Sequence, residues 1–178
     1  MARFHSILAL LLWIPIAGGA LAQTREVCLD DQAGLNAPAM GSFYKEFHLL
    51  VGARGVRLEG EACASDAIRV SLYRSAVGRP ADVLGAAPLV HGSRIAPRLE
   101  IYYDRVVALM PEAECWSIVG RALARVAAHE VAHFIDQDQN HGDGLLQARF
   151  SGAELAADDS YPFRWISSQT KPAAGKRQ

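Results

Sequence analysis

The sequence predicts an α+β domain, in which a twisted sheet packs on two main helices and a small C-terminal part follows. Two segments of alternating apolar and polar residues, Val56–Glu59 and Ile68–Tyr73, are typical of strands. Two other segments, one early in the chain and a longer one in its second half, carry apolar residues at helical spacing. The 178 residues contain no internal repeat or long low-complexity linker, so we expect one domain.

The N-terminal half is expected to begin with a strand at 26–29 and a helix after it. Asn36 is a favourable helix N-cap, and Pro38 lies early in that helix, where proline is tolerated. His48, in the same helix, is interpreted as a polar neighbour of the core and not as a metal ligand. The helix is expected to bury an apolar stripe that consists of Met40, Phe43, Tyr44, Phe47, Leu50 and Val51.

The second half is expected to place a loop, a strand and a short helical turn before a long helix. Proline and glycine punctuate the loop at 78–97, and a strand at 99–103 and a helical turn at 104–110 follow. The long helix is predicted to start at Pro111 and to end in the polar run after Ile135, with Gly120 as a weak point inside it. Its small apolar back face is expected to pack on the sheet through Ala124, Ala127, Ala128, Val131 and Ile135.

The long helix carries the motif His129-Glu130-Val131-Ala132-His133. Residues four apart lie on one face of a helix, so both imidazoles can bind one metal ion. Glu130 points away from that line and can reach a water molecule on the metal. This pattern is typical of the zinc site of metalloproteases, where the glutamate acts as general base.

A catalytic zinc ion needs a third protein ligand and leaves its fourth position for water. His141 is the favoured third ligand, because the turn-forming residues at 140–144 let the chain double back under the helix end. Glu154 competes for this role, with Asp158 one turn further along the chain. Ser151 and Glu154 also have the spacing of a capping box, which gives Glu154 a sufficient structural role.

The stretch 121–155 resembles the active-site region of small secreted bacterial zinc peptidases related to the metzincins. Those families carry HExxH, a turn, a third histidine and a Gly-hydrophobic-Met element. This chain departs from the pattern, because Asp136 occupies the usual glycine position and the third histidine lies further away. Leu145, Leu146 and Gln147 stand where the methionine is expected, so the floor under the zinc ion is expected to be leucine. Glu154 and Asp158 instead resemble the gluzincin arrangement, in which a later glutamate is the third ligand.

These features imply a zincin-like fold and a zinc metalloendopeptidase-like hydrolase that acts on a peptide or protein. Glu130 would take a proton from water and pass it to the leaving amine. Tyr103, Tyr161 and His91 are possible donors to the oxyanion. An extended substrate is expected to pair with the strand at 99–103, taken as an edge strand above the helix.

A second class of function is a non-catalytic secreted zinc-binding or protein-binding domain with a degenerate peptidase site. The intact Glu130 argues against degeneracy, because a structural site gains nothing from a general base. Structural zinc sites are also usually closed by four protein ligands, often cysteines. Only His129, His133 and His141 are evident ligands in this sequence.

The start of the chain has the features of a signal peptide over 1–22. Arg3 precedes an apolar run at 7–16 that is short for a membrane span, and Ala20-Leu21-Ala22 is a small-x-small cleavage signal. Residues 23–178 would then form the domain, with 171–178 as a disordered tail. The protein is expected to be secreted or periplasmic, with no stable membrane anchor after cleavage.

Charge and cysteine content limit the partners and the compartment. The formal net charge of −1 gives no electrostatic footprint for nucleic acid, and the oligomeric state stays open. Export permits disulfides, and the three cysteines, Cys28, Cys63 and Cys115, predict one bridge and one further thiol. Cys63 is expected to pair with either Cys28 or Cys115.

The leader assignment predicts that the exported protein begins at Gln23. Intact-mass measurement of protein recovered outside the cytoplasm is expected to give the mass of 23–178, because the signal peptidase cuts after Ala22. Recovery of a chain that still holds residues 1–22 would show an anchored protein and contradict the expected localisation.

Overall fold

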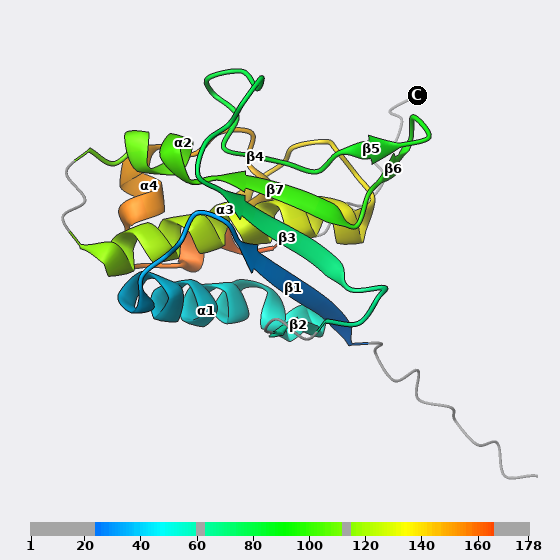
Figure 1. The fold of residues 1–178 in the computed structure, drawn as a ribbon, viewed down its shortest axis with the longest axis horizontal. Coiled ribbons are helices and arrows are strands. Elements are labelled where there is room, and N and C mark those ends of the chain that lie inside the picture. Colours follow the sequence, from blue (N-terminus) through cyan, green and yellow to red (C-terminus); the bar gives the residue numbers. More distant parts are fainter. Residues whose placement is uncertain (1–23, 60–62, 112–114, 166–178) are drawn as a thin grey trace, which may run out of the picture.

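The computed structural model describes residues 24–59, 63–111 and 115–165. The expected signal peptide at 1–22 and the expected tail at 171–178 therefore lie outside the described residues. The fold is α+β, with a mixed five-stranded sheet and two long helices packed on one of its faces (Figure 1). The helices that the structure describes include none that is long and apolar enough to cross a membrane.

The elements follow the predicted order closely. The strands are β1 (Arg25–Asp31), β2 (Val56–Glu59), β3 (Ile68–Tyr73), β4 (Gly85–Ala86), β5 (Leu89–Val90), β6 (Arg94–Ile95) and β7 (Arg98–Tyr102). The α-helices are α1 (Ala37–Val51), α2 (Tyr103–Ala108), α3 (Trp116–Asp136) and α4 (Gly152–Ala156). Single 3₁₀ turns occur at Gly52–Arg54 (η1), Gly144–Leu146 (η2) and Tyr161–Phe163 (η3).

The sheet has the strand order β2-β1-β3-β7-β4. The first four strands run parallel, and β4 runs antiparallel to β7, with Gly85 opposite Ile101 and Ala86 opposite Glu100. The expectation that the strand at 99–103 forms the sheet edge is therefore wrong, because β7 lies between β3 and β4. The edge strand on this side of the sheet is β4, whose two residues lie inside the segment expected to be a loop.

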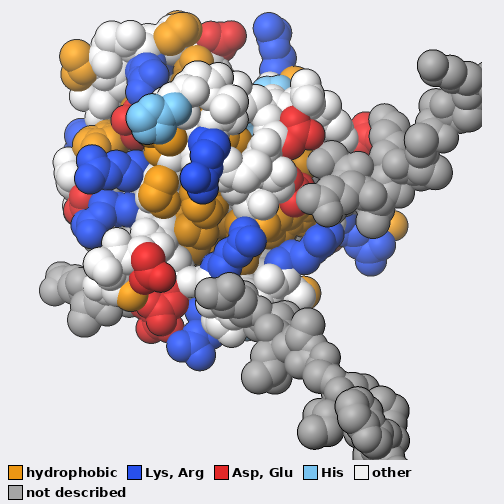
Figure 2. Space-filling view, turned by 90° about the vertical axis from the view of Figure 1, so that its right-hand side faces the viewer, with side chains coloured by type: hydrophobic (Ala, Val, Ile, Leu, Met, Phe, Trp, Pro, Cys, Tyr) orange, Lys and Arg blue, Asp and Glu red, His pale blue; other side chains and the backbone are white. Residues whose placement is uncertain are grey.

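The core lies between the sheet and the two long helices. Side chains on one face of the strands, among them Val27, Val70 and Ile101, are fully buried against α1 and α3. The opposite face carries Glu26, Arg69 and Glu100 among the alternate residues, and Cys28, Ser71 and Tyr102 on that face are buried. Basic and acidic side chains lie among hydrophobic and neutral ones on the molecular face shown in Figure 2.

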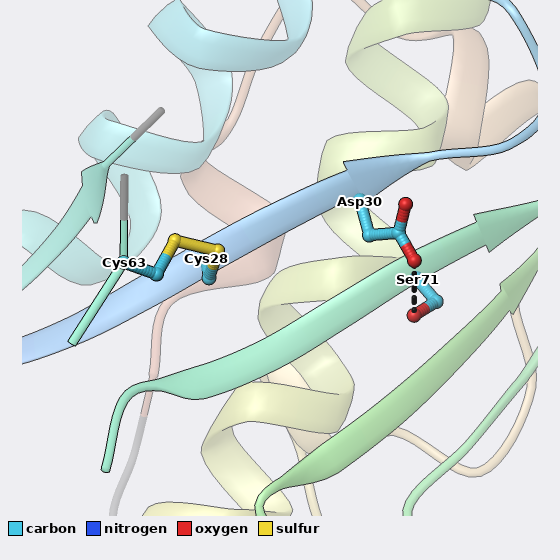
Figure 3. The surroundings of a disulfide bond; sticks show 4 residues. All are labelled: Cys28, Asp30, Cys63 and Ser71. Atoms are coloured by element: carbon cyan, nitrogen blue, oxygen red, sulfur yellow. Dashed lines mark hydrogen bonds between the residues drawn. A yellow bond between two sulfur atoms is a disulfide. The ribbon is translucent and has the colours of Figure 1, made fainter. Parts of the chain in front are cut away.

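A disulfide joins Cys28 on β1 to Cys63 just ahead of β3 (Figure 3). It decides between the two pairings left open by the sequence, and Cys115 is a free and exposed thiol. Cys28 lies on the outer side of β1, as does Asp30, which accepts a hydrogen bond from the Ser71 hydroxyl of β3 at 3.3 Å. The bridge therefore ties the connection between β2 and β3 to the centre of the sheet.

Helix α3 starts later than predicted, because its first residue is Trp116, with Cys115 as N-cap. The predicted weak point inside it, Gly120, is a site of close helix contact. A Cβ atom built on Gly120 would lie 1.9 Å from the carbonyl oxygen of Ala39 on α1. A glycine at this position lets the backbones of α1 and α3 approach each other, which a helix-propensity scale does not reveal.

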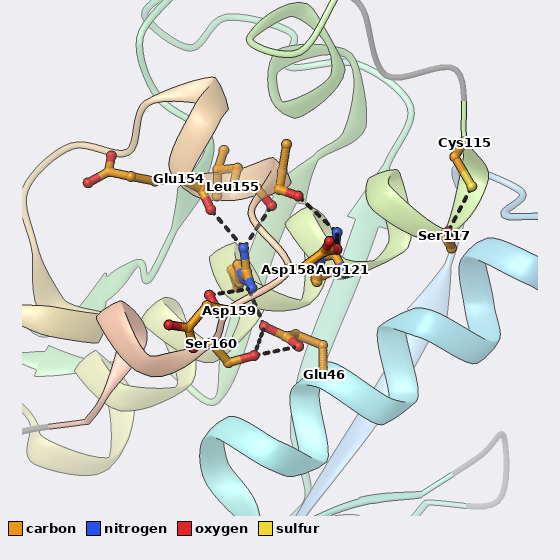
Figure 4. Close-up of polar contacts among 11 residues, drawn as sticks. Glu46, Cys115, Ser117, Arg121, Glu154, Leu155, Asp158, Asp159 and Ser160 are labelled. Carbon is orange, nitrogen blue, oxygen red and sulfur yellow. Dashed lines mark hydrogen bonds and ion pairs between the residues drawn. The ribbon is translucent and has the colours of Figure 1, made fainter.

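A buried ion pair also joins the two long helices. The Nε atom of Arg125 on α3 donates to Glu46 on α1 at 2.7 Å, and the Arg125 side chain has no exposed surface. Its remaining nitrogens donate to the carbonyl oxygens of Glu154, Leu155 and Asp159. Figure 4 shows these groups converging from α1, α3 and the C-terminal segment. One side chain thus connects three parts of the fold.

Alanine substitution at two helix glycines should have opposite effects on stability. Gly120→Ala places a methyl group against the Ala39 carbonyl, so it is expected to destabilise the protein by about 1–3 kcal/mol. Gly41→Ala on α1 meets nothing within 4 Å and should stabilise it by about 0.5–1 kcal/mol. Urea unfolding of both variants measures the difference, and equal stability of the two would contradict a close helix contact at Gly120.

Candidate metal centre

Helix α3 buries all three polar residues of the His-Glu-x-x-His motif. His129, Glu130 and His133 are 6%, 7% and 5% exposed, respectively. The helix ends directly after them, because Gln137 takes a left-handed conformation with φ 50° and closes the C-terminus through hydrogen bonds to His133 and Phe134. The motif therefore lies in the last turns of a helix whose other face is packed on the sheet.

Two backbone carbonyls fix the orientation of the motif histidines. The Nδ1 atom of His129 lies 2.7 Å from the Leu145 carbonyl oxygen, and Nδ1 of His133 lies 2.6 Å from that of Asp138. A carbonyl can only accept, so each Nδ1 carries the proton and each Nε2 keeps its lone pair. The two Nε2 atoms are 3.0 Å apart.

His141 completes the cluster from the loop that follows α3. Its ring centroid lies 5.4 Å from that of His129 and 5.0 Å from that of His133. One ligand nitrogen from each of the three histidines lies within 4.8 Å of the other two. His141 is exposed, whereas the two helix histidines are buried. The structure therefore brings the three sequence-predicted ligands close enough together to hold one metal ion.

The donor set fits a cation. Two imidazole lone pairs that face each other at 3.0 Å repel unless a positive charge lies between or beside them. Carbonyl oxygens that accept from Nδ1 are frequent partners of metal-binding histidines, because they hold the ring and make its other nitrogen more basic. The arrangement can thus bind a metal through three nitrogens and leave further positions open.

The loop between α3 and α4 positions His141 and the Leu145 carbonyl. The Gly142 amide donates to the Leu146 carbonyl at 2.9 Å, which closes the loop on itself. Gly144 has φ +67°, and a Cβ atom there would lie 2.3 Å from the Arg164 carbonyl oxygen, so this turn requires glycine. Leu145 and Leu146 are buried at the position where the sequence led us to expect a leucine floor.

Burial changes the proton affinity of the site in the absence of metal. Desolvation, together with the neighbouring His133, lowers the pKa of His129 to about 3, and desolvation also lowers the pKa of His133. Both imidazoles are therefore kept neutral, which is the form that binds metal. Burial raises the pKa of Glu130 to about 8, and a nearby cation would act in the opposite direction.

Glu154 and Asp158 do not belong to the histidine cluster. Glu154 accepts from the amide and the hydroxyl of Ser151, both at 2.7 Å, in the capping box expected at the start of α4. The hydrogen bond from the Ser151 backbone is the main reason why the pKa of Glu154 is lowered. Asp158 forms an ion pair with Arg121 at 2.9 Å. Both carboxylates thus have other interactions.

A cleft of about 500 Å³ gives access to the centre. His129, Glu130 and His141 line it, together with residues of the β4 region, of α2 and of the 147–150 segment. A Cβ atom built on Gly85 of β4 would lie 2.8 Å from Glu130 Oε1, so the edge strand lies directly beside the carboxylate. The cleft therefore has the antiparallel edge strand β4 on one side, with His129, Glu130 and His141 also in its lining.

The three residues proposed as oxyanion donors lie elsewhere. Tyr103, Tyr161 and His91 are not among the residues that line this cleft. The Tyr103 ring lies under Arg74, and the Tyr161 ring lies under Arg164. His91 has φ 52° and lies in the exposed turn between β5 and β6. The polar side chains that do line the cleft beside the motif include Arg105, Gln147 and Arg149.

Phe150 is a site residue that sequence reasoning missed. Its ring packs edge-on against His129 with centroids 5.3 Å apart, and against Phe163 at 5.5 Å. It covers one side of a ligand ring and connects the cleft to the C-terminal segment. A single aromatic residue between a loop and a helix cap carries no periodic signal, so this contact could not be predicted from the sequence.

Comparison of the chain with protein-family models, with curated proteins and with solved structures gave no match. Function is therefore inferred from the histidine cluster, Glu130 and the cleft.

The ligand set predicts how metal content responds to substitution. His129→Ala, His133→Ala and His141→Ala should each lose bound metal, since each removes one nitrogen from the cluster. Glu154→Gln should keep the metal and cost only a helix cap, about 1 kcal/mol, and His48→Ala on the exposed side of α1 is the matched histidine control. Elemental mass spectrometry of the purified variants measures this. Full metal occupancy in His141→Ala with loss in Glu154→Gln would reverse the assignment.

Proposed function

We propose that this chain is a secreted zinc-dependent metallopeptidase with a zincin-like fold, related to the metzincins, that hydrolyses peptide bonds in peptides or proteins. The observation that carries the proposal is the cluster of His129, His133 and His141 beside a cleft that His129, His141 and Glu130 line. Three protein ligands and an accessible cleft are typical of catalytic zinc sites, whereas structural sites are usually closed by four ligands.

Zinc is the metal that the donor set favours. Three neutral imidazoles form the ligand set of several catalytic zinc centres, whereas magnesium and calcium prefer oxygen ligands. A zinc ion held by these histidines would lower the pKa of a bound water molecule and would polarise a carbonyl oxygen. Among the described residues, neither the disulfide-bonded cysteines nor Cys115 belongs to the metal cluster.

Glu130 is proposed as the general base and then the general acid. Its neighbours in sequence are ligands or core residues, but its own carboxylate lies in the cleft beside β4. From there it can accept a proton from water and deliver it to the leaving amine. Burial raises the pKa of Glu130 in the absence of metal, and a zinc ion beside it would oppose that shift and favour the ionised form that accepts the proton.

Strand β4 is proposed as the substrate-binding edge, in place of the strand at 99–103. It is the last strand of the sheet and runs beside Glu130. An extended peptide can add to such an edge through main-chain hydrogen bonds, which places its backbone across the cleft. Gly85 keeps this side of the cleft open, since any larger residue would meet the carboxylate.

The proposed location is outside the cytoplasm. The Cys28–Cys63 bridge supports it, because disulfides persist in oxidising compartments. The net charge of the chain is close to zero and the face shown in Figure 2 carries both basic and acidic side chains, so we propose no nucleic-acid partner.

The alternative function is a secreted metal-binding or protein-binding domain without peptidase activity. It would need the same histidine cluster but not Glu130. A single substitution therefore separates the two functions.

Glu130→Gln is expected to abolish peptide hydrolysis and to leave metal content unchanged, because the amide cannot accept a proton. Hydrolysis of fluorescent casein and zinc stoichiometry are measured on the same preparation, with Glu59→Gln on β2 as a matched control. Glu59 is paired with Arg57 on the surface, so this control should behave like the natural protein. Wild-type protein that holds one zinc ion and cleaves no peptide in a proteome-derived library would favour the non-catalytic alternative.

A further inference from the structure

Two arginines line the cleft that contains the proposed catalytic residues. Arg105 is on α2 and Arg149 is in the segment between η2 and α4, and both line the same cleft as His129 and Glu130. The two arginines belong to segments far apart in sequence that meet at this cleft. Neither residue belongs to the metal cluster.

Only part of the hydrogen-bonding capacity of the Arg105 side chain is used within the protein. Its Nη1 atom donates to the Ala81 carbonyl at 3.3 Å, a long hydrogen bond, and its Nε atom is buried without a hydrogen-bond partner. The ion pairs within the described ranges involve neither Arg105 nor Arg149. A partly buried guanidinium without a carboxylate partner is costly, because desolvation of its charge is not offset.

Two other arginines with little exposed surface, the buried Arg125 and the half-buried Arg121, have acidic partners. Arg125 uses Nε, Nη1 and Nη2 in hydrogen bonds to Glu46 and to three carbonyl oxygens. Arg121 also has an unpartnered Nε atom, but it forms an ion pair with Asp158 and donates to the Ala156 carbonyl. Arg105 therefore differs from both in lacking an acidic partner, and it is the one of the three that lines the cleft.

The remaining surface of the cleft suits a short acidic group on an apolar stem. Leu109, Val126 and Phe150 contribute apolar surface to the same cleft. Asp82 also lines the cleft, but it is exposed and forms no ion pair with either arginine among the described residues. The guanidinium groups thus remain available to a ligand.

We propose that Arg105, assisted by Arg149, binds a carboxylate of the peptide substrate next to the scissile bond. The planar guanidinium presents paired N–H donors that match the two oxygens of a carboxylate. This inference rests on the proposed peptidase function and names its substrate class: peptides that place a carboxylate in this cleft. The carboxylate belongs either to a glutamate or aspartate side chain or to the C-terminus of the peptide, and both present the same chemical group.

Matched peptides test the proposal and separate the two sources. Short alanine-based peptides carry one glutamate at each position in turn, and each has a counterpart with glutamine there. A second pair has no acidic side chain and differs only in a free or amidated C-terminus. The natural protein should favour the carboxylate member of one pair by on the order of tenfold in kcat/KM, as expected for a hydrogen bond to a charged group.

Variants assign the preference to the arginines. Arg105→Gln should bring the ratio between the matched peptides close to one, and Arg149→Gln should reduce it less. Arg105→Lys should keep part of it, because the charge remains but the paired donors are lost. Arg69→Gln, on the sheet face opposite α3, should leave the ratio and the activity unchanged. Thermal unfolding of each variant shows whether it is folded.

A binding measurement keeps the test independent of catalysis. Calorimetric titration of the same peptides into Glu130→Gln should show tighter binding of the carboxylate members, and the double variant Arg105→Gln with Glu130→Gln should lose the difference. Cleavage by the natural protein with no preference in either pair would overturn the carboxylate site and leave the peptidase intact. Preferential binding without cleavage would support the site and count against the peptidase. Equal binding of all peptides by Glu130→Gln would also overturn the site.

Discussion

The buried pair of Arg125 and Glu46 is the interaction on which the arrangement of the metal centre depends. Arg125 lies one helical turn before His129 and joins α3 to α1 and to three carbonyls of the C-terminal segment. That segment returns to the centre, because the Arg164 carbonyl accepts from the Leu145 amide at 3.0 Å and the Leu145 carbonyl orients His129. Loss of one partner would leave an uncompensated buried charge, at a cost of about 3–5 kcal/mol.

Much of this fold could be predicted from the sequence, because short-range signals fix many of its elements. Strands β2 and β3 have the predicted bounds, and the Asn36 side chain caps α1 by accepting a hydrogen bond from the Ala39 amide. The His-Glu-x-x-His spacing alone sufficed to place two imidazoles on one helix face. His141 was expected because it follows the polar turn at the end of the helix, and the structure places it beside His129 and His133.

The features that could not be predicted depend on contacts distant in sequence. Strand β4 has two residues and no periodicity, so β7 was wrongly taken as the sheet edge. Gly120 was judged by its helix propensity, whereas its role is set by the Ala39 carbonyl of another helix. The histidines are oriented by backbone carbonyls, which every residue has and which no side-chain pattern can reveal. The tyrosines proposed as oxyanion donors were chosen by residue type alone, and the tertiary fold placed them elsewhere.

The three histidines of the candidate metal centre differ in how firmly the fold holds them. His129 and His133 are buried on a helix packed against the sheet, and each has a fixed Nδ1 partner. His141 is exposed on a loop closed by the hydrogen bond from Gly142 to Leu146. Ordering such a loop costs conformational entropy, which metal binding offsets when the ligand lies on the loop itself. A metal ion bound at this centre would therefore also fix the loop that carries the Leu145 carbonyl and, just beyond it, the Arg149 and Phe150 wall of the cleft.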